Sequence, residues 1–424
     1  MRIKSFFLLV AVAALPFAAL AQKERATYDE AAIAPYTLPD MMVTEAGKNI
    51  TSVTEWESRR AELINLFSEH MYGFLPADKV KVRYKTVEQS ADALGGKAIR
   101  KQVIATFTAN GKSASLHILI YLPKEAKKPV PLFFGLNFYG NHAINSDPAI
   151  LKTDAFALNV DEKGIFNNKS SEAIRGIQST RWCAERVINE GYGLATVYYG
   201  EIYPDHEQGR DEGLAALLNK KDDAARWEAI GAWAWGISRA MDYLITDKAI
   251  DSEKVILLGH SRLGKAALWA GAQDTRFAAV ISNDSGCGGS ALFRRKIGET
   301  ASIINAYFPH WFCENFKKYN DKEELLPVDQ HQLIALVAPR PVYISSAEDD
   351  LWADPKGEYL SAFYAGKAYG LYGLKGLESE AVPPVNTPVG NYVGYHIRTG
   401  GHNVTPYDWE CFLNFANRFF KAGR

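Results

Sequence analysis

The sequence predicts an α/β protein whose central sheet is mostly parallel and is covered by helices on both faces. Three observations predict it. Stretches of strand character alternate with stretches of helix character over the C-terminal two thirds of the chain, which is typical of parallel sheets. The 424 residues, 47% of them hydrophobic, are enough to bury a large core. The chain has neither an internal repeat nor a low-complexity linker, so we expect one domain.

The expected elements follow one another along the chain. Residues 22–50 are polar and irregular and are expected to form an N-terminal arm. Apolar residues at strand or helix spacing, bounded by Gly and Pro, define the other elements. Strands are expected at 80–87, 97–108, 114–122, 129–138, 193–199, 255–258, 277–282, 341–345 and 392–399. Helices are expected at 55–72, 184–189, 225–246 and 407–421, with 139–181 and 287–332 as insertions around a functional site.

The first residues have the pattern of a secretory leader. Two basic residues precede an apolar run over 6–20, and Ala19-Leu20-Ala21 is a typical cleavage site. This run is too short to span a bilayer, and no later stretch of about 18 uninterrupted apolar residues occurs. We therefore expect a signal peptide over 1–21 with cleavage after Ala21, a periplasmic or secreted protein, and no membrane partner.

Charge and cysteine content narrow the function classes. The formal net charge is −1, without a basic cluster, which does not favour a nucleic-acid partner. No motif indicates a cofactor, and we expect a monomer. The four cysteines, at positions 183, 287, 313 and 411, permit two disulfides in an exported protein, in any of three pairings. None of them lies in a C-x-x-C motif, so no metal site is expected.

The stretch VILLGHSRLGK, residues 255–265, indicates a nucleophile. An apolar strand ends in Gly259-His260-Ser261, and a helical stretch follows at once. This is the strand–turn–helix pattern of the nucleophile elbow of the α/β-hydrolase fold, which would make 51–424 a catalytic domain. Gly264 lies one place later than the second glycine of the usual G-x-S-x-G. The alternative is an ordinary β–α turn in which Ser261 is an N-cap.

A serine hydroxyl needs a base that is itself oriented by a carboxylate. In α/β-hydrolases these groups follow the serine in the order acid, then histidine, each at the carboxyl end of a strand. His402 lies just after the last expected strand, in RTGGHN, where two glycines let the backbone turn back toward the sheet. The alternative for His402 is an ordinary loop histidine. We expect structural roles for His310, His331 and His396.

Two places could supply the acid. Asp349 and Asp350 follow the strand at 341–345, and Asp284 follows the strand at 277–282. Either place can reach the histidine in this fold. We favour Asp350 over Asp349, because Asp-Leu-Trp puts it at the turn itself. Alternatively, either of these two carboxylates caps the turn into Trp352, which is a common role for Asp.

At this point the sequence resembles the glucuronoyl esterases, carbohydrate esterase family 15. The resemblance covers most of the chain after the leader and rests on six motifs in the same order. They are GAWAWG at 231–236, GHSRLGK at 259–265, SGCGG at 285–289, WFCENF at 311–316, WADP at 352–355 and TGGH at 399–402.

The resemblance implies a role for each matching residue. Ser261 matches the family's nucleophile and His402 its base. Asp284 and Asp350 match the two places where members carry the acid, the first of which is Glu in many members. Arg262 matches an arginine that helps to stabilise the oxyanion, alongside its own N–H. The positions that match binding of the glucuronate are Lys265, Glu299 and Trp352. Cys287 and Cys313 match a disulfide beside the site, and Cys183 with Cys411 would then form a second.

The substrate that the resemblance implies is an ester between (4-O-methyl)glucuronic acid of glucuronoxylan and an alcohol of lignin. From the residues alone, Lys265 shares a helix face with Ser261 at i, i+4 spacing but could be a solvated charge. Trp352 could be a core residue, and Glu299 has the character of a surface carboxylate. The alternatives are another carbohydrate esterase, such as an acetylxylan esterase, a serine peptidase, a non-catalytic carbohydrate-binding protein, and a metal-dependent hydrolase. The chain has no H-x-H or H-E-x-x-H motif, which does not favour the metal-dependent hydrolase.

Overall fold

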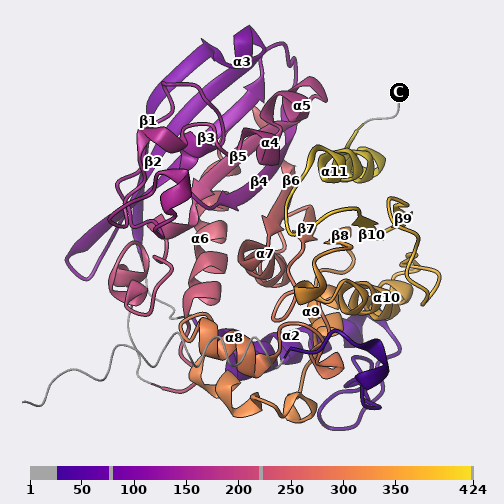
Figure 1. Ribbon diagram of the computed structural model, residues 1–424. Coiled ribbons are helices and arrows are strands. Elements are labelled where there is room, and N and C mark those ends of the chain that lie inside the picture. The colour runs from indigo at the N-terminus through magenta and orange to yellow at the C-terminus, as the bar shows by residue number, and fades with distance from the viewer. Residues whose placement is uncertain (1–25, 76–79, 219–222, 422–424) are drawn as a thin grey trace, which may run out of the picture.

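The computed structural model describes residues 26–75, 80–218 and 223–421 (Figure 1). Its centre is a 10-stranded sheet in the order β1-β2-β3-β5-β4-β6-β7-β8-β10-β9. The strands are β1 Lys81–Asp92, β2 Ala98–Ala109, β3 Lys112–Pro123, β4 Val130–Asn137, β5 Gly193–Tyr198, β6 Ile250–His260, β7 Ala279–Asn283, β8 Val342–Ala347, β9 Val389–Gly390 and β10 Val393–Arg398.

The strands from β5 to β10 form a continuous parallel block, β5-β4-β6-β7-β8-β10. The strands β1, β2 and β3 are antiparallel to one another, and β3 is antiparallel to β5. In the parallel block all carboxyl ends meet at one edge of the sheet. The loops that follow β6, β7, β8 and β10 are therefore neighbours, although they lie far apart in the sequence.

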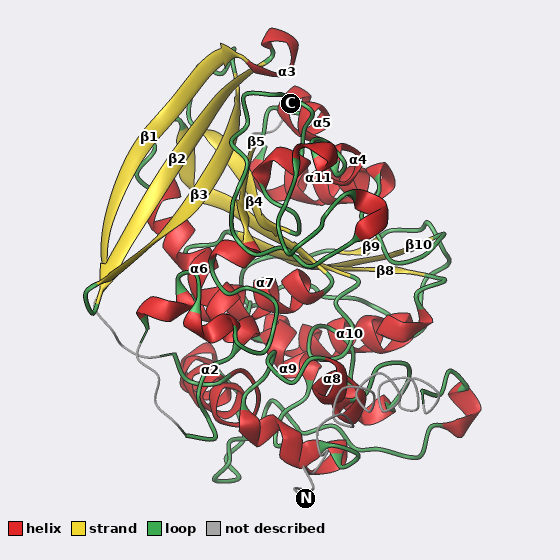
Figure 2. Ribbon diagram, turned by 60° about the vertical axis from the view of Figure 1, so that its left-hand side comes forward, coloured by secondary structure: helices red, strands yellow, loops and turns green. Residues whose placement is uncertain are grey.

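Helices cover both faces of this sheet (Figure 2). Helices α4, α5 and α11 lie on one face, and α6, α7 and α10 lie on the other, with α2, α8 and α9 farther from the sheet on that side. The bounds are α2 Val53–Phe67, α3 Ala93–Gly96, α4 Ser179–Trp182, α5 Ala184–Asn189, α6 Ala229–Leu244, α7 Arg262–Gln273, α8 Ala301–Tyr307, α9 Gln330–Ala335, α10 Pro355–Leu371 and α11 Pro406–Phe420.

Each face of the sheet has its own apolar core. The larger core lies on the α6 and α7 side and includes the fully buried rings of Trp56, Trp233 and Trp269. The smaller core lies under α5 and α11 and includes Phe133 and Trp409, whose rings meet edge to face at 5.3 Å. The architecture is that of an α/β-hydrolase, as the sequence predicts.

All nine expected strands are present, and β9 is an additional short one. Helix α6 begins at Ala229 rather than at residue 225, because the N–H groups of Ala229 and Ile230 bond to the carbonyls of His310 and Trp311. Helix α10 was not expected. Its 17 residues include three glycines and are buried around much of the helix, so they show no clear amphipathic period.

The predicted leader, 1–21, lies outside the described residues. The described part of the arm lies against the domain: the Gly298 N–H donates to the Thr27 carbonyl at 2.9 Å, and His331 Nε2 lies 3.0 Å from the Pro39 carbonyl. Within the described ranges, no helix is long and apolar enough to cross a bilayer.

Candidate active site

Ser261 stands at the turn from β6 into α7 in a backbone conformation that side chains rarely adopt. Its φ is 57° and its ψ is −132°. Its N–H donates to the carbonyl of Asn283 at the end of β7, at 2.9 Å. A Cβ on Gly259 would lie 2.1 Å from the Leu263 carbonyl oxygen, so only glycine lets α7 start this close to β6. The turn thus has the geometry of a nucleophile elbow.

The late position of the second glycine has a packing reason. The side chain of Leu263 is buried in the larger core, so position 263 accepts a side chain. A Cβ on Gly264 would instead lie 2.9 Å from Ser282 Oγ and from the Ser285 Cβ. Close packing of α7 on the end of β7 therefore falls at position 264. Ser261 is not an ordinary N-cap, because its side chain makes no capping hydrogen bond to α7.

His402 and Asp350 come from the loops that follow β10 and β8. His402 Nδ1 lies 2.6 Å from Asp350 Oδ2. The His402 side chain is 44% exposed, whereas that of Asp350 is buried. Ser261, His402 and Asp350 all line one pocket. Among the described residues no hydrogen bond joins Ser261 to His402, a contact that often tightens only when substrate binds. Asp349, the alternative acid, is exposed to solvent.

Asp284 lies behind the same histidine, on the loop after β7. Its nearest side-chain oxygen, the Asp350 carboxylate and a His402 ring nitrogen all lie within 4.8 Å of one another. Its Oδ2 accepts from the Asn403 N–H at 3.3 Å and from Arg398 Nη2 at 3.4 Å, while Oδ1 has no partner in the described part of the chain. Burial, then the nearby Glu358 and Asp350 carboxylates, raises the pKa of Asp284 well above its usual range.

Arg398 holds the loop that carries His402. This buried side chain donates to the carbonyls of Thr399 (3.0 Å), Gly401 (3.1 Å) and Asn403 (2.6 Å). Its Nε also donates to Asp408 Oδ2 at 2.8 Å. One guanidinium therefore fixes the backbone on both sides of the imidazole.

Arg262, the residue after the serine, is held by a buried carboxylate. Its Nη1 is paired with Asp205 Oδ2, and its guanidinium lies 4.7 Å from the ring centre of Trp311. Asp205 Oδ1 also accepts from the Trp311 indole and lies 2.8 Å from His310 Nε2. Burial alone would raise the pKa of Asp205, but Arg262 and His310 lower it to about 2. The pair stays charged, and the backbone N–H of Arg262, at the start of α7, has no acceptor within the helix.

Lys265 and Glu299 form a buried ion pair at 3.6 Å. Lys265 Nζ also donates to the carbonyls of Ser285 (2.7 Å) and Cys287 (2.6 Å), so it is not a solvated helix charge. The Glu299 side chain is only 6% exposed, so it is not a surface carboxylate. Burial raises its pKa, and Lys265 opposes that rise. The Glu299 N–H donates to the Trp352 carbonyl at 3.0 Å, and Trp352 is only partly buried, so it is not a core residue.

The expected disulfides are not formed, because all four cysteines are free thiols. The Cys313 thiol faces the Glu69 carbonyl at 3.7 Å and the Cys183 thiol faces the Thr180 carbonyl at 3.1 Å. Burial raises the pKa of Cys313 to about 11 and that of Cys287 well above its usual value. The predicted disulfides Cys287–Cys313 and Cys183–Cys411 are absent from the described residues.

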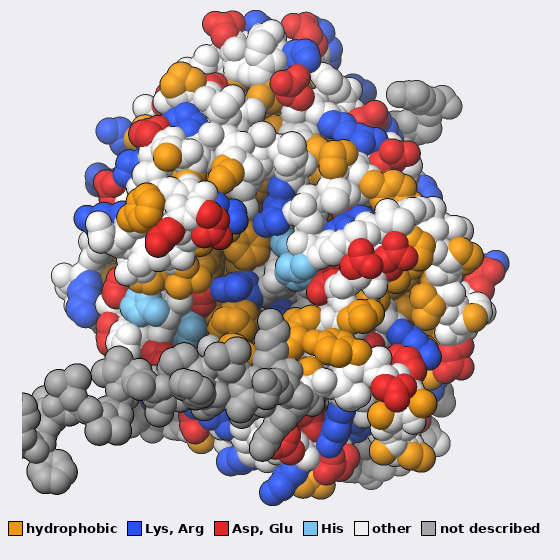
Figure 3. Space-filling view, viewed as in Figure 1, with side chains coloured by type: hydrophobic (Ala, Val, Ile, Leu, Met, Phe, Trp, Pro, Cys, Tyr) orange, Lys and Arg blue, Asp and Glu red, His pale blue; other side chains and the backbone are white. Residues whose placement is uncertain are grey.

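These residues meet in a pocket of about 270 Å³, here called the Ser261 pocket. It is lined by Ser261, Arg262, Lys265, Asp284, Ser285, Gly286, Glu299, Phe308, Trp311, Asp350, Trp352, Ala353 and His402. Every residue favoured from the sequence for catalysis or sugar binding lines it, whereas the alternative acid Asp349 does not. The surface is hollowed near the middle of this face, where basic, histidine and apolar side chains gather (Figure 3).

Sequence reasoning missed Asp205 and Arg398, which hold Arg262 and the His402 loop. Asp205 lies in the segment after β5, and this position near a strand end is the one feature of the sequence that indicates a site residue. His310, expected to be structural, supports Asp205. His396 bonds to Asp408 through Nε2 at 2.9 Å.

The fold and this pocket define an enzyme class: the protein is a carboxylic-ester hydrolase of the α/β-hydrolase fold. A family model described as glucuronyl esterase, fungi, matches residues 188–373. A carbohydrate esterase of an unknown prokaryotic organism is 48% identical over 408 residues, which are 95% of this chain and 94% of that protein. A 4-O-methyl-glucuronoyl methylesterase of Hypocrea jecorina is 27% identical over 351 residues, 79% of this chain and 62% of that protein.

Solved structures of the same family are also similar to this chain. A promiscuous esterase of carbohydrate esterase family 15 from a marine bacterial metagenome matches with a TM-score of 0.87 and 48% identity, covering 92% of this chain and 99% of that one. A glucuronoyl esterase from Solibacter usitatus matches with a TM-score of 0.86 and 44% identity, covering 91% and 99%. The chain belongs to carbohydrate esterase family 15, the glucuronoyl esterases, and the resemblance seen in its motifs is confirmed.

Proposed function

We propose that the enzyme hydrolyses esters between the carboxyl group of (4-O-methyl)glucuronic acid on glucuronoxylan and the alcohols of lignin. The observation that carries this proposal is the composition of the Ser261 pocket. The candidate relay of Ser261, His402 and Asp350 shares it with the buried pair of Lys265 and Glu299. A simple ester needs only the relay, whereas a sugar acid offers hydroxyls to a charged pair.

In this proposal Ser261 Oγ attacks the ester carbonyl carbon while His402 Nε2 takes the hydroxyl proton. Asp350 accepts the Nδ1–H of His402, which fixes the tautomer and stabilises the imidazolium. The tetrahedral intermediate expels the alcohol, which takes the proton from His402. A water molecule then attacks the acyl-enzyme and passes a proton to His402. The bond to Ser261 Oγ breaks, His402 returns the proton to this oxygen, and the uronic acid leaves.

The oxyanion would be stabilised from two directions. The N–H of Arg262 lies at the start of α7, and the Arg262 side chain brings a positive charge to the same pocket. Asp205 binds Nη1 of this guanidinium and holds it in place, so that its other N–H groups can donate to the oxyanion. A donor that is preorganised in this way is typically worth about 3 kcal/mol of transition-state stabilisation.

The sugar would be held by Lys265, Glu299 and Trp352. Two of the three Lys265 donors bind carbonyls, so the third is directed to Glu299 or to a substrate oxygen. Removing charges from water costs several kcal/mol for each ion. Two apolar side chains of equal size would avoid this cost. Charged groups that face a pocket instead can bind hydroxyl groups of a ligand, so the pair of Lys265 and Glu299 favours a polyhydroxylated ligand.

Assays with two substrates test this proposal. The purified enzyme should hydrolyse benzyl glucuronate and leave acetylated xylan largely intact. A higher kcat/KM on acetylated xylan would make it an acetylxylan esterase, and unchanged activity after chelation would exclude a metal-dependent reaction. We also propose that the chain is exported. Expression of the full chain in a Gram-negative host should yield mature protein outside the cytoplasm, beginning at Gln22, and retention of residues 1–21 would contradict this.

A further inference from the structure

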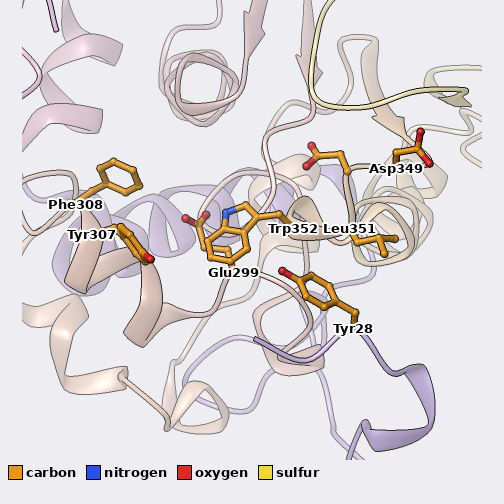
Figure 4. A pocket seen from close by; sticks show the side chains of 8 residues that line it. Tyr28, Glu299, Tyr307, Phe308, Asp349, Leu351 and Trp352 are labelled. Carbon is orange, nitrogen blue, oxygen red and sulfur yellow. The ribbon is translucent and has the colours of Figure 1, made fainter. Parts of the chain in front are cut away.

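A second pocket adjoins the Ser261 pocket, and the N-terminal arm forms part of its wall. It has a volume of about 560 Å³, within the range typical of ligand pockets. We call it the Tyr28 pocket; it is lined by Tyr28, Glu299, Tyr307, Phe308, Asp349, Asp350, Leu351 and Trp352 (Figure 4). In Figure 4, Trp352 and Glu299 lie between Tyr307 and Phe308 on one side and Tyr28 and Leu351 on the other.

The arm fixes Tyr28 in this wall from both sides. Before it, the Thr27 carbonyl accepts the Gly298 N–H at 2.9 Å. After it, Glu30 pairs with Arg295 and, at 2.6 Å, with Lys356. Nevertheless 46% of the Tyr28 surface is exposed. A ring that is anchored through its neighbours, yet open to solvent, is available to a ligand.

The position of this pocket indicates which end of the substrate reaches it. The two pockets share Glu299, Phe308, Asp350 and Trp352. Neither Ser261 nor His402 lines the Tyr28 pocket. The alcohol of the ester must leave beside Ser261 and His402, while Glu299 and Trp352 face the sugar of the acyl group. The Tyr28 pocket therefore continues from the residues that face the acyl sugar and does not include the two residues beside which the alcohol leaves.

The lining of this pocket suits neutral sugar rings. Tyr28, Tyr307 and Trp352 supply aromatic faces for the C–H faces of a pyranose. The carboxylates of Asp349 and Glu299 accept hydrogen bonds from hydroxyl groups. No lysine or arginine lines the pocket within the described ranges, so a second acidic sugar would be repelled.

We propose that the Tyr28 pocket binds the neutral pyranose chain to which the esterified uronic acid is attached, and that Tyr28 is a specificity-determining residue contributed by the arm. This inference rests on the proposed function, because it takes the acyl group to be a glucuronate. It adds that the enzyme recognises the glycan and not only the ester.

The test compares two substrates that carry the same benzyl ester. One is benzyl glucuronate and the other is the same ester with its uronic acid attached to two xylose units. The native enzyme should have a kcat/KM at least 5-fold higher on the longer substrate, mainly through KM. Tyr28→Ala should abolish most of this preference and leave kcat/KM on benzyl glucuronate within 2-fold. Tyr28→Phe should keep most of the preference, because it keeps the aromatic face.

Two further variants make the result decisive. Leu351→Ala changes the same pocket without touching the arm and should also reduce the preference. Phe166→Ala removes an aromatic ring of similar exposure, 53%, that lies outside both pockets, and should change nothing. Circular dichroism melts confirm that each variant is folded.

Three outcomes would overturn the inference. They are an absence of preference in the native enzyme, an equal loss on both substrates in Tyr28→Ala, and a Tyr28→Ala effect that follows the alcohol when benzyl and methyl esters are compared. The last would place the alcohol in this pocket. Failure of the proposed function looks different, because the native enzyme would then not hydrolyse benzyl glucuronate at all.

Discussion

Asp350 and His402 are 52 positions apart in the chain and are joined by a contact of 2.6 Å between a carboxylate oxygen and a ring nitrogen. They meet because β8 and β10 are parallel neighbours, so the loops at their carboxyl ends leave the sheet side by side. Asp284 follows β7, on the other side of β8, and its carboxylate lies near the same imidazole. The sheet order therefore brings two carboxyl groups to one histidine.

The two carboxyl groups should contribute unequally to catalysis. Asp350 contacts His402 directly, whereas Asp284 binds Arg398 and the Asn403 N–H, and burial and nearby carboxylates raise its pKa. Asp350→Asn should lower kcat by roughly 1,000-fold, because the tautomer of His402 is no longer fixed. Steady-state kinetics on benzyl glucuronate measure this.

Asp284→Asn is the matched control, since it makes the same chemical change at the second carboxyl. It should lower kcat by less than about 10-fold, and the double variant should be less active than Asp350→Asn alone. A larger loss from Asp284→Asn than from Asp350→Asn would reverse the assignment.

Arg398 should act by positioning His402. Arg398→Lys keeps the positive charge but cannot reach the carbonyls of Thr399, Gly401 and Asn403 together. We expect kcat to fall by about 10-fold or more with KM little changed, and Arg398→Met to be worse. A lower melting temperature with an unchanged kcat in the remaining folded enzyme would limit Arg398 to a structural role.

Arg262 and Lys265 should differ in the range of esters they affect. Arg262→Ala should lower kcat by about 100-fold on benzyl glucuronate and on 4-nitrophenyl acetate alike, because every ester forms an oxyanion. Lys265→Ala should lower kcat/KM by about 10- to 100-fold on the glucuronate and much less on the acetate.

The ratio of the two activities is the readout, because Lys265→Ala also leaves Glu299 buried without its ion-pair partner and should cost about 3 kcal/mol of stability or more. A ratio unaffected by Lys265→Ala would remove the lysine from sugar binding. A loss confined to glucuronate esters in Arg262→Ala would remove the arginine from the oxyanion site.

Glu358 should make stability depend on pH. Burial raises its pKa from 4.5 to about 7, although Gly286, Ser290 and Ser346 donate hydrogen bonds to it. Between these two pH values the folded protein keeps a proton that the unfolded chain releases. The free energy of unfolding therefore falls as pH rises from 4.5 to 7, by about 3 kcal/mol for this group.

Glu358→Gln keeps an acceptor for Gly286 and Ser290 and gains an amide donor for Ser346, but does not titrate. Its stability relative to the native enzyme should rise between pH 5 and pH 7.5, as urea unfolding at both values would measure. Parallel pH profiles for the two proteins would show that Glu358 does not titrate in this range.

The sequence predicts the parallel block and its edge well, because buried strands leave long apolar runs and the site residues follow strand ends. It gives only one weak signal for Asp205, the position after β5, because this residue lies in an irregular segment and acts through Arg262. Nor does it predict the burial of Lys265 and Glu299, whose partners are backbone carbonyls and each other. Long-range partners of this kind leave no spacing in the chain.

Two other differences have physical causes. Arg398 occupies the last position of an ordinary strand, and only the tight turn after β10 folds three carbonyls back onto it. The cysteines illustrate the opposite error: a family pattern implied two bonds, whereas all four cysteines are free, and Cys313 and Cys183 face backbone carbonyls instead.

The most direct test of the account is the turnover of benzyl glucuronate by Ser261→Ala and Ser285→Ala, two serines that line the same pocket. Ser285 is bonded to Ser282 and Ser290, and its loss should leave most of the activity. Ser261→Ala should lower kcat by about 100,000-fold or more while the folded protein still binds the uronic acid product. Comparable turnover by the two variants would contradict a reaction that begins at the Ser261 hydroxyl.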